Sequence, residues 1–557
     1  MKRTVWGGSL FAVCVAALLF AGEAQAQQNV DTRVALKKLV DATNQLPPNV
    51  RNHLSGGMQN YLRYAAAIVS GTSAQGIRGE LSTQQERARQ TSTAPGGTIQ
   101  VSNPAMDFAR KGFTQSTTSS AWCGNSVVVG YEDTSAFFRT NPSDQFGVPV
   151  SLDGVSFSTD AGAKFTDIGF LTPGTFSFNA LLGDPVVTCS NPKHFQYASI
   201  LNTTTPDGQN PIIGPSVSFS TDSGRSWSSP LQAVSVDGNT ELIDKPWMAV
   251  DPTDPQRLYM TYTHIITLAC VNIEMVSSVD GGKRWSAPTI VVADCANFGA
   301  DMLTGSNVVV SPGGKVYVAY EFIPVPPPGT NFVDNAIFFA RSLNHGESFS
   351  RPFKIADVVP GGDGIELNGH VLVDEYPQLA VDRTNKPSRG TVYLTWPDGR
   401  DKIVPDASAP SGTYAYPDIF VAKSTSFGES FKILGPISPT PEDFSGMGRD
   451  QFLPGVAVDR DGEVAVCYYD RRNDRANLRI DRYCSISGNE GKSWKDLRAS
   501  DLNWMPTPDL DPLDPRPGAA IGKYDALTSE FLLHSDGFFG AFEIEISGNP
   551  NIVAKKF

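Results

Sequence analysis

Runs of alternating apolar and polar residues begin near residue 119 and continue almost to the C-terminus. One unit is especially clear: Leu453–Val458, a turn at Asp459–Gly462, Val464–Tyr469 and Leu478–Cys484 read as three successive strands. An alternation with a period of two residues is typical of strands with one buried face. Comparable units start near residues 121, 185, 246, 307 and 377. The pattern predicts an all-β protein built from repeated four-stranded sheets.

A short motif, Ser-x-Asp/Asn-x-Gly-x-x-Trp/Phe with small variations, occurs six times, each time after a predicted third strand. The copies are Ser158–Phe165, Ser220–Trp227, Ser278–Trp285, Ser342–Phe349, Ser424–Phe431 and Ser487–Trp494. The Asp, Asn or Ser at the third position can accept hydrogen bonds from nearby backbone N–H groups, and glycine permits the positive φ of a tight turn. We expect the final aromatic ring to be buried between neighbouring sheets.

These six copies resemble the Asp box, or BNR repeat, of the sialidase superfamily of β-propellers. The resemblance implies a ring of blades, because one four-stranded blade cannot bury its faces alone. We expect six Asp-box blades within residues 105–557. A last two-strand piece, from Tyr524 to Glu545, has no box. It either pairs with an N-terminal strand as a partial seventh blade or completes a ring of six.

A short helical segment precedes the repeats. Apolar residues recur at helical spacing over residues 30–46 and 49–70, which Pro47-Pro48 separates. Residues 91–104 have the composition of a linker. We therefore interpret residues 27–104 as an N-terminal helical segment followed by a linker.

Residues 1–26 have the pattern of a secretory signal peptide: Lys2-Arg3, an apolar run and Ala24-Gln-Ala26. The mature protein is therefore expected to be secreted or periplasmic. No second long apolar segment follows, so we expect no integral membrane segment after signal removal. The formal net charge of −13 makes nucleic acid and anionic membranes poor partners. We expect a monomer.

Six cysteines follow the predicted signal peptide: Cys123, Cys189, Cys270, Cys295, Cys467 and Cys484. An even number in an oxidising compartment permits disulfides. Cys467 and Cys484 fall on consecutive predicted strands of one blade, and Cys270 and Cys295 flank a box. Both pairs are candidates, and buried free thiols are the alternative.

The longest predicted loops join the second strand of a blade to the third, or one blade to the next, on the face opposite the boxes. These loops carry the densest charge: Glu132-Asp133, Asp184, Asp244-Lys245, Glu321, Asp374-Glu375-Tyr376, Asp398 to Asp401, Arg449-Asp450, Asp470 to Asp474 and Lys523-Tyr524-Asp525. We expect them to converge on one mouth of the ring. The alternative for any single residue is a salt-bridged cap on a strand end.

The resemblance to sialidases implies roles for some of these residues. Sialidases use a tyrosine nucleophile with a glutamate base and an aspartate acid, and arginines hold the carboxylate sugar. In chain order this makes Tyr524, Glu375 and Asp133 the catalytic candidates. The substrate-binding candidates are Arg400, Arg449, Arg471 and Arg472, with Asp398 and Asp470. The histidines show no metal-ligand spacing, so no metal or other cofactor is predicted, and Ca²⁺ among the acidic loops is left open.

The expected function is that of a secreted sialidase-like glycoside hydrolase of the exo-sialidase type, with a glycan or glycoconjugate as partner. A non-catalytic propeller that binds glycan or protein with the same face is the alternative, because the fold hosts both. A polysaccharide lyase comes third. It would need a Tyr/His pair on the ring, for which His264 and His370 are the loop candidates.

Overall fold

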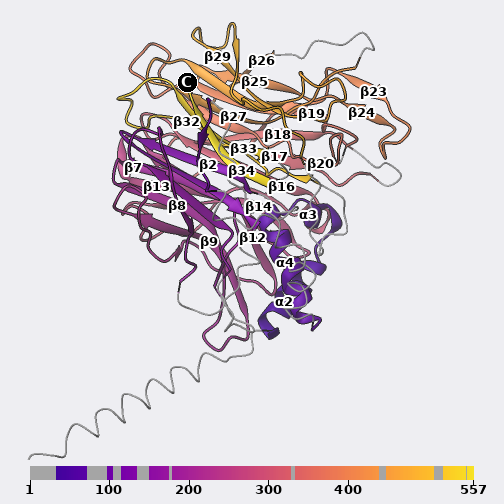
Figure 1. Ribbon diagram of the computed structural model, residues 1–557. Helices are drawn as coiled ribbons and strands as arrows, with labels where there is room; N and C mark the ends of the chain where they lie inside the picture. The colour runs from indigo at the N-terminus through magenta and orange to yellow at the C-terminus, as the bar shows by residue number, and fades with distance from the viewer. Residues whose placement is uncertain are drawn as a thin grey trace, which may run out of the picture.

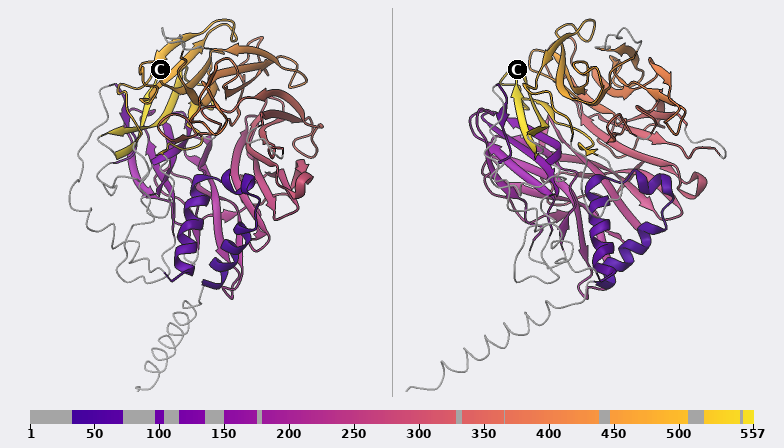
Figure 2. Two further views of the ribbon diagram at one scale, coloured as in Figure 1. Left: turned by 90° about the vertical axis from the view of Figure 1, so that its right-hand side faces the viewer. Right: turned by 45° about the vertical axis from the view of Figure 1, so that its right-hand side comes forward.

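A computed structural model describes residues 33–71, 97–103, 115–134, 150–174, 179–327, 333–364, 366–437, 447–506, 519–546 and 549–557. They form an all-β, seven-bladed propeller with short helices near the N-terminus (Figure 1). The chain follows the ring once, as the order of colours shows in the left view of Figure 2. The predicted signal peptide and half of the predicted linker lie outside the described residues.

The first three blades are antiparallel sheets whose strands run in chain order from the axis outward. Blade 1 holds β2 (Gln115–Cys123), β3 (Ser126–Asp133), β4 (Asp153–Ser158) and β5 (Thr166–Phe170). Blade 2 holds β7 (Val186–Asn191), β8 (His194–Thr204), β9 (Pro211–Ser220) and β10 (Leu231–Gln232), with β6 (Ala180–Leu181) and β11 (Val236–Asp237) added. Blade 3 holds β12 (Glu241–Asp251), β13 (Asp254–Ile266), β14 (Cys270–Ser278) and β15 (Thr289–Asp294).

The next three blades repeat the arrangement. Blade 4 holds β16 (Met302–Val310), β17 (Val316–Ile323), β18 (Asn335–Ser342) and β19 (Phe353–Val358). Blade 5 holds β21 (Gln378–Val381), β22 (Val392–Asp398), β25 (Asp418–Ser424) and β26 (Lys432–Pro436). Blade 6 holds β27 (Gln451–Val458), β28 (Val464–Asp470), β29 (Asp481–Ser487) and β30 (Lys495–Arg498). The loops also form two small pairs, β20 (Val371–Leu372) with β31 (Ala519–Ala520) and β23 (Ile403–Pro405) with β24 (Thr413–Ala415).

The seventh blade includes an N-terminal strand, which confirms one of the two predicted alternatives; it is a complete blade rather than a partial one, and the ring of six is wrong. It consists of β32 (Leu527–Ser529), β33 (Phe538–Ile546), β34 (Asn549–Lys556) and β1 (Ile99–Gln100). The outermost strand, β1, comes from the N-terminal side and pairs antiparallel with β34. The two ends of the propeller therefore close the ring together. The sequence pattern missed β34 because polar residues at its ends hide its apolar middle, Ile552–Ala554.

The six boxes share one geometry. In each, the glycine N–H donates to the hydroxyl of the box serine over 2.8–3.0 Å. The residue before that glycine also has a positive φ, between 55° and 74°, so the turn needs two left-handed residues rather than one. The aromatic rings are half-buried, which corrects the expectation of full burial. Phe165, for example, lies 5.7 Å from Phe539 of blade 7, centroid to centroid, while its outer edge faces solvent.

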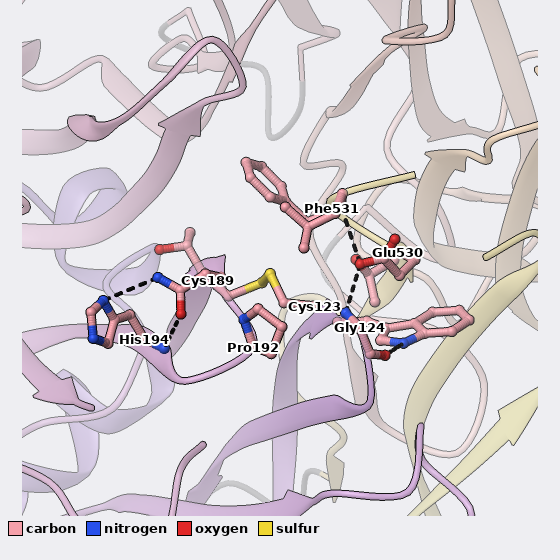
Figure 3. The surroundings of a disulfide bond; sticks show 12 residues. Cys123, Gly124, Cys189, Pro192, His194, Glu530 and Phe531 are labelled. Carbon is pink, nitrogen blue, oxygen red and sulfur yellow. Dashed lines mark hydrogen bonds between the residues drawn. A yellow bond between two sulfur atoms is a disulfide. The ribbon is translucent and has the colours of Figure 1, made fainter. Parts of the chain in front are cut away.

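Three disulfides join the six cysteines. The predicted pairs Cys467–Cys484 and Cys270–Cys295 are confirmed, with Cα–Cα distances of 4.0 and 4.1 Å. The third bond, Cys123–Cys189, links the inner strands β2 and β7 of adjacent blades (Figure 3). Beside it the Gly124 N–H donates to Glu530 of blade 7 over 2.7 Å. Three disulfides indicate an oxidising, extracellular-type environment.

The helices α2 (Arg33–Asn44), α3 (Pro48–Asn52) and α4 (Gly56–Val69) stand against one face of the ring (Figures 1 and 2). Their apolar sides join the core of blades 2–4. This shared core includes Leu39, Val50, Met58 and Leu62 from the helices, Leu54 from the connection between α3 and α4, and Leu242, Ile265, Met302 and Leu303 from the strands. In the part of the chain that the structure describes, no helix has the length and apolar character needed to cross a membrane.

Candidate functional site at the ring axis

The backbone of the inner strands bends in the same way on the face of the ring opposite the boxes. At that end, five of the inner strands have a residue with a positive φ, between 51° and 59°. These residues are Thr117, Asp184, Lys245, Gly305 and Leu453. A side chain in this region of φ costs roughly 1–3 kcal/mol, and such strain gathers at functional sites. In blades 1, 3, 4 and 6 the kink coincides with a shift in the strand register, as in a β-bulge, which re-aims the neighbouring side chains.

Charged side chains from six blades meet beside these kinks. We call this set the axial cluster: Glu132, Asp184, Asp244, Lys245, Glu321, Asp374, Glu375, Tyr376 and Lys523. Lys523 lies just before the first strand of blade 7, and Asp374 lies just before the first strand of blade 5. The distance from Lys523 Nζ to Asp374 Oδ2 is 2.6 Å. Lys245 of blade 3 donates to the hydroxyl groups of Thr304, over 3.1 Å, and of Tyr376. The structure thus brings together loop residues far apart in sequence.

Two glutamates of the cluster form a carboxyl pair. The side-chain amide of Asn335 donates to Glu321 over 2.8 Å and to Glu375 over 3.3 Å. Burial raises the pKa of Glu375 to about 7, although the Gly361 N–H, 3.1 Å away, partly stabilises its charge. Burial, followed by the charges of Glu375 and Asp374, raises the pKa of Glu321 well above its usual value. The pair therefore holds a proton near neutral pH.

In contrast to the glutamate pair, Asp374 favours the ionised form. Burial alone would raise its pKa, but the ammonium groups of Lys523 and Lys245 outweigh burial and hold the pKa well below its usual value. An ionised carboxylate and a protonated carboxyl pair therefore lie next to each other. Such a division between neighbouring carboxyl groups is the pattern of an acid/base site.

On the side of blades 1–3, the negative charges of the acidic groups are less well balanced by nearby positive charges. Burial, then the charge of Asp244, raises the pKa of Asp184 to about 8. Burial likewise raises the pKa of Asp244 and of Glu132. Hydrogen bonds from Ser55 and from the Lys245 N–H offset this rise only in part for both Asp184 and Asp244. Burial therefore favours the protonated form of these carboxyl groups.

Tyr524, the predicted nucleophile, crosses the axis beneath the cluster. Its hydroxyl donates to the Pro185 carbonyl over 3.0 Å, and its ring meets Trp247 of blade 3 edge-on, 5.0 Å between centroids. Burial, then the nearby Asp184 and Glu132, raises its pKa well above the usual value. Its hydroxyl is therefore engaged by a backbone carbonyl, whereas Glu375 bonds Asn335 and the Gly361 N–H. The structure does not bring the predicted nucleophile and base together by a hydrogen bond.

Asp133, the predicted acid, is buried at the end of β3, where it accepts a hydrogen bond from the side-chain amide of Gln115 over 3.0 Å. Among the three predicted catalytic residues, only Glu375 belongs to the axial cluster.

Three of the four predicted substrate-binding arginines are engaged by aspartates. Arg400 bonds Asp398 and the Asp357 carbonyl on the outer strand of blade 4. Arg472 bonds Asp470 over 2.6 Å and Asp496 on the outer strand of blade 6 over 2.6 Å. Both guanidinium groups therefore point outward rather than to the axis.

The other two arginines are buried. Arg471 Nη1 pairs with Asp450 Oδ2 over 2.8 Å, and neither side chain is exposed. Arg449 donates to the Gly448 carbonyl over 2.6 Å. The outcome for Arg400, Arg471 and Arg472 is the salt-bridged cap that the sequence left open as an alternative.

Residues 53–57, which connect α3 to the first turn of α4, were not predicted to take part in the site, yet they contact the cluster. The His53 carbonyl accepts a hydrogen bond from Lys245, and the Ser55 N–H donates to Asp244 Oδ2 over 2.9 Å. The signal in the sequence was Ser55-Gly56-Gly57, because two glycines weaken a helix start and are kept where backbones approach closely.

The histidine candidates lie elsewhere. His264 bridges Glu241 and Glu274, at 2.9 Å each, on blade 3. Both of its ring nitrogens thus bond carboxyl groups, and the Tyr262 hydroxyl donates to the other oxygen of Glu274 over 3.1 Å. His370 pairs with Glu366 at 2.5 Å and is largely exposed. Within the described ranges no group of three His, Cys, Asp or Glu residues has the arrangement of a metal site.

No family model and no curated protein matches this sequence. Solved propellers are similar in fold. The α-L-arabinofuranosidase of Fusarium graminearum in complex with arabinobiose is 10% identical, with a TM-score of 0.43, over 83% of this chain and 97% of that one. A Hadza microbial sialidase is 13% identical, with a TM-score of 0.40, over 74% of each chain. A polysaccharide lyase named as an ulvan lyase is 10% identical, with a TM-score of 0.44, over 82% of this chain and 95% of that one. At such identities the similarity concerns the fold and not the activity.

Proposed function

We propose that the protein is an exported glycoside hydrolase whose site is the axial cluster, with Glu375 as proton donor and Asp374 as the ionised carboxylate. The observation that carries this proposal is the different surroundings of two adjacent buried carboxyl groups: Asp374 lies 2.6 Å from Lys523 Nζ, whereas Glu375 shares the Asn335 amide with Glu321. Burial raises the pKa of Glu375 to about 7, and the two lysines hold the pKa of Asp374 far below that of an ordinary carboxyl group.

This division suits the cleavage of a glycosidic bond. A protonated carboxyl group gives its proton to the leaving oxygen, while an ionised carboxylate on the other side attacks the sugar or activates a water molecule. Glu321 and Asn335 position Glu375, since Asn335 donates to both glutamates. Lys245 and Lys523 keep Asp374 charged and can also donate hydrogen bonds to sugar hydroxyls.

The contacts argue against the finer exo-sialidase assignment. A tyrosine nucleophile needs a lowered pKa or an adjacent base, and burial raises the pKa of Tyr524 well above its usual value. A sialic-acid site also needs free arginine forks, whereas Arg400, Arg471 and Arg472 each pair with an aspartate. We therefore propose a glycan that does not depend on an arginine clasp.

The second candidate is a non-catalytic propeller that binds glycan or protein with the same face. The observation that favours it is the burial of the cluster, in which Asp374 and Glu375 are each only 6% exposed. In that case the carboxyl groups would stabilise the packing of the blades around the axis and would not take part in catalysis.

The test is a substrate screen with a matched pair of variants. The exported protein is assayed on chromogenic aryl glycosides, including an α-L-arabinofuranoside and a sialoside, and on polysaccharides by release of reducing ends. Glu375→Gln should lower the turnover of whichever substrate responds by roughly 100-fold or more, because the donor proton is lost. Glu366→Gln, which changes the carboxyl group that holds His370 on the same connecting segment, should have less than a twofold effect.

The pH profile separates chemistry from binding. Activity should fall as the pH rises through about 7, because Glu375 must be protonated and its pKa is about 7. No matching fall should come from Asp374 between about pH 4 and 7, since its pKa lies below that range. Full activity of Glu375→Gln would refute Glu375 as the proton donor. Binding of a glycan array with no turnover of any substrate would favour the binding propeller.

A further inference from the structure

A cavity of about 220 Å³ lies on the ring axis at the box-side ends of the inner strands. All seven blades contribute to its wall, mainly with apolar residues such as Met248, Val309 and Val381. Trp247 borders the cavity and meets the Tyr524 ring edge-on, so the cavity is separate from the axial cluster. An apolar cavity of roughly 150 Å³ accommodates benzene in another protein, so this one has room for a slightly larger ligand.

Arg383 stands at the box-side end of this cavity, in the turn from β21 to β22, and is partly buried. Among the described residues that form the wall, it alone carries a charge. Its Nη1 donates to the Phe531 carbonyl over 3.2 Å, and the guanidinium carbon lies 4.8 Å from the centroid of the Phe531 ring. Its Nε and Nη2 donate no hydrogen bond to a described residue. This edge of a guanidinium can bind a carboxylate through two parallel hydrogen bonds.

The nearby carboxylates do not neutralise Arg383, and none of the described residues forms a salt bridge with it. The Glu530 carboxylate accepts from three backbone N–H groups, those of Gly124, Leu532 and His534. Figure 3 shows the bond from Gly124. Burial lowers the pKa of Arg383 to about 10, and the charges of Glu530 and Asp382 offset this only in part. The positive charge at the cavity is therefore incompletely balanced by the protein.

Ser120 adds a second incompletely paired group to the wall. Its Oγ atom is buried and has no hydrogen-bond partner among the described residues. The other hydroxyl groups of the wall each donate to a neighbouring oxygen, those of Thr188, Thr528 and Ser529. Because buried polar groups in native proteins are nearly always hydrogen-bonded to protein, water or a ligand, this hydroxyl also points to an occupant of the cavity.

We propose that the cavity binds a small organic carboxylate with an apolar tail. Nε and Nη2 of Arg383 hold the head group, and the tail lies against the inner strands. A neutral molecule of the same size would leave the guanidinium edge without a partner, and a bare anion such as acetate would leave the apolar wall uncovered. The site is on the box face, so it does not depend on the glycoside hydrolase assignment.

The test is isothermal titration calorimetry of the full-length chain at about pH 7, with hexanoate as the probe. Hexan-1-ol reports the contribution of the tail alone, and acetate that of the head group alone. Hexanoate should bind at one site per chain, about tenfold or more tightly than either, because only hexanoate satisfies both the guanidinium and the apolar wall.

Arg383→Gln should weaken hexanoate binding by about tenfold or more, because the charge-assisted hydrogen bonds are lost, and should leave hexan-1-ol binding within about twofold. Lys386→Gln is the matched control. It removes the same charge from the same turn, but its side chain is half-exposed and faces Asp461 of blade 6, so hexanoate affinity should stay within about twofold.

Arg383→Lys provides a further variant if Arg383→Gln fails to fold, because it keeps the charge and removes the planar fork. It should weaken hexanoate binding by about threefold or more. Absence of hexanoate binding to the wild-type protein, or equal binding to the wild-type protein and a folded Arg383 variant, would overturn the proposal. Hexan-1-ol binding as tightly as hexanoate, or an equal loss in Lys386→Gln, would overturn it too.

Discussion

Asp153 gives the sharpest prediction about stability. This carboxyl group at the start of β4 is completely buried against blade 2, where Ser199 Oγ donates to it over 2.5 Å and the Tyr197 hydroxyl over 3.3 Å. Burial raises its pKa to about 7 despite these two hydrogen bonds. Replacement by asparagine keeps the shape and removes the titration. Ser199 can then accept from the new amide and keep donating to the Gly183 carbonyl, 3.1 Å away.

The sign and size of this pH effect on stability follow from the pKa of Asp153 in the folded and in the unfolded protein. The unfolded pKa of an aspartate is about 3.9, so the folded protein holds this proton more tightly and Asp153 lowers the free energy of unfolding as the pH rises. With about 1.4 kcal/mol per pKa unit, the loss amounts to roughly 4 kcal/mol once the pH passes the folded pKa. Between about pH 5 and 8.5 the change is roughly 3 kcal/mol, because part of the loss has already occurred at pH 5.

The assay compares urea unfolding of the wild-type protein and Asp153→Asn, with disulfides intact, at about pH 5, 7 and 8.5. The free energy of unfolding of the variant, minus that of the wild-type protein, should rise by about 3 kcal/mol from about pH 5 to 8.5. The other titrating groups cancel in this difference. Asp357→Asn, at a side chain that is 60% exposed, should give a flat difference. A flat difference for Asp153→Asn as well would refute the reasoning.

Three further predictions concern packing, closure and the axial tyrosine. Trp227→Ala should cost about 2 kcal/mol in urea unfolding, below the ~3–5 kcal/mol of a fully buried ring, because Trp227 is half-buried. Replacing Cys123 and Cys189 together by alanine opens a loop of 66 residues and should cost up to about 4 kcal/mol by the same measurement. Tyr524→Phe loses one hydrogen bond and should cost about 1–2 kcal/mol of stability while lowering glycoside turnover less than threefold. Abolished sialoside cleavage by that variant would restore the nucleophile assignment.

The local patterns of this chain were readable in the sequence. Each box is set by residues within about eight positions, so the six turns and the strands before them follow from local pattern alone. Cys467 and Cys484 fall on neighbouring strands, and the observed register pairs them directly. The Asp398–Arg400 and Asp470–Arg472 pairs are equally local, because an aspartate at a strand end accepts from an arginine two residues on. The sequence allowed that interpretation and also the catalytic one.

Long-range contacts were not readable. The sequence offered closure by an N-terminal strand as one alternative, but the pairing of Ile99 with Ala554 depends on both ends of the propeller meeting, and nothing near either residue marks that register. The position of the helices depends on a core shared with three blades, whereas a helical pattern reveals only which of its faces is apolar. The exclusion of Tyr524 and inclusion of Asp374 at the site depend on side-chain directions across the axis, which chain order cannot supply.

The packing along the axis determines the side from which a ligand can reach the cluster. The cavity of about 220 Å³ also lies on the axis, but its walls are the box-side ends of the inner strands, such as Val308–Val310 and Val456–Val458, with Phe531 among them. Trp247 borders this cavity and meets Tyr524, whose hydroxyl is tied to Pro185 of another blade. The two aromatic rings therefore stand between the cavity and the axial cluster. A glycan that reaches Asp374 must therefore come from the opposite face, where the His53 carbonyl and the Ser55 N–H contact Lys245 and Asp244.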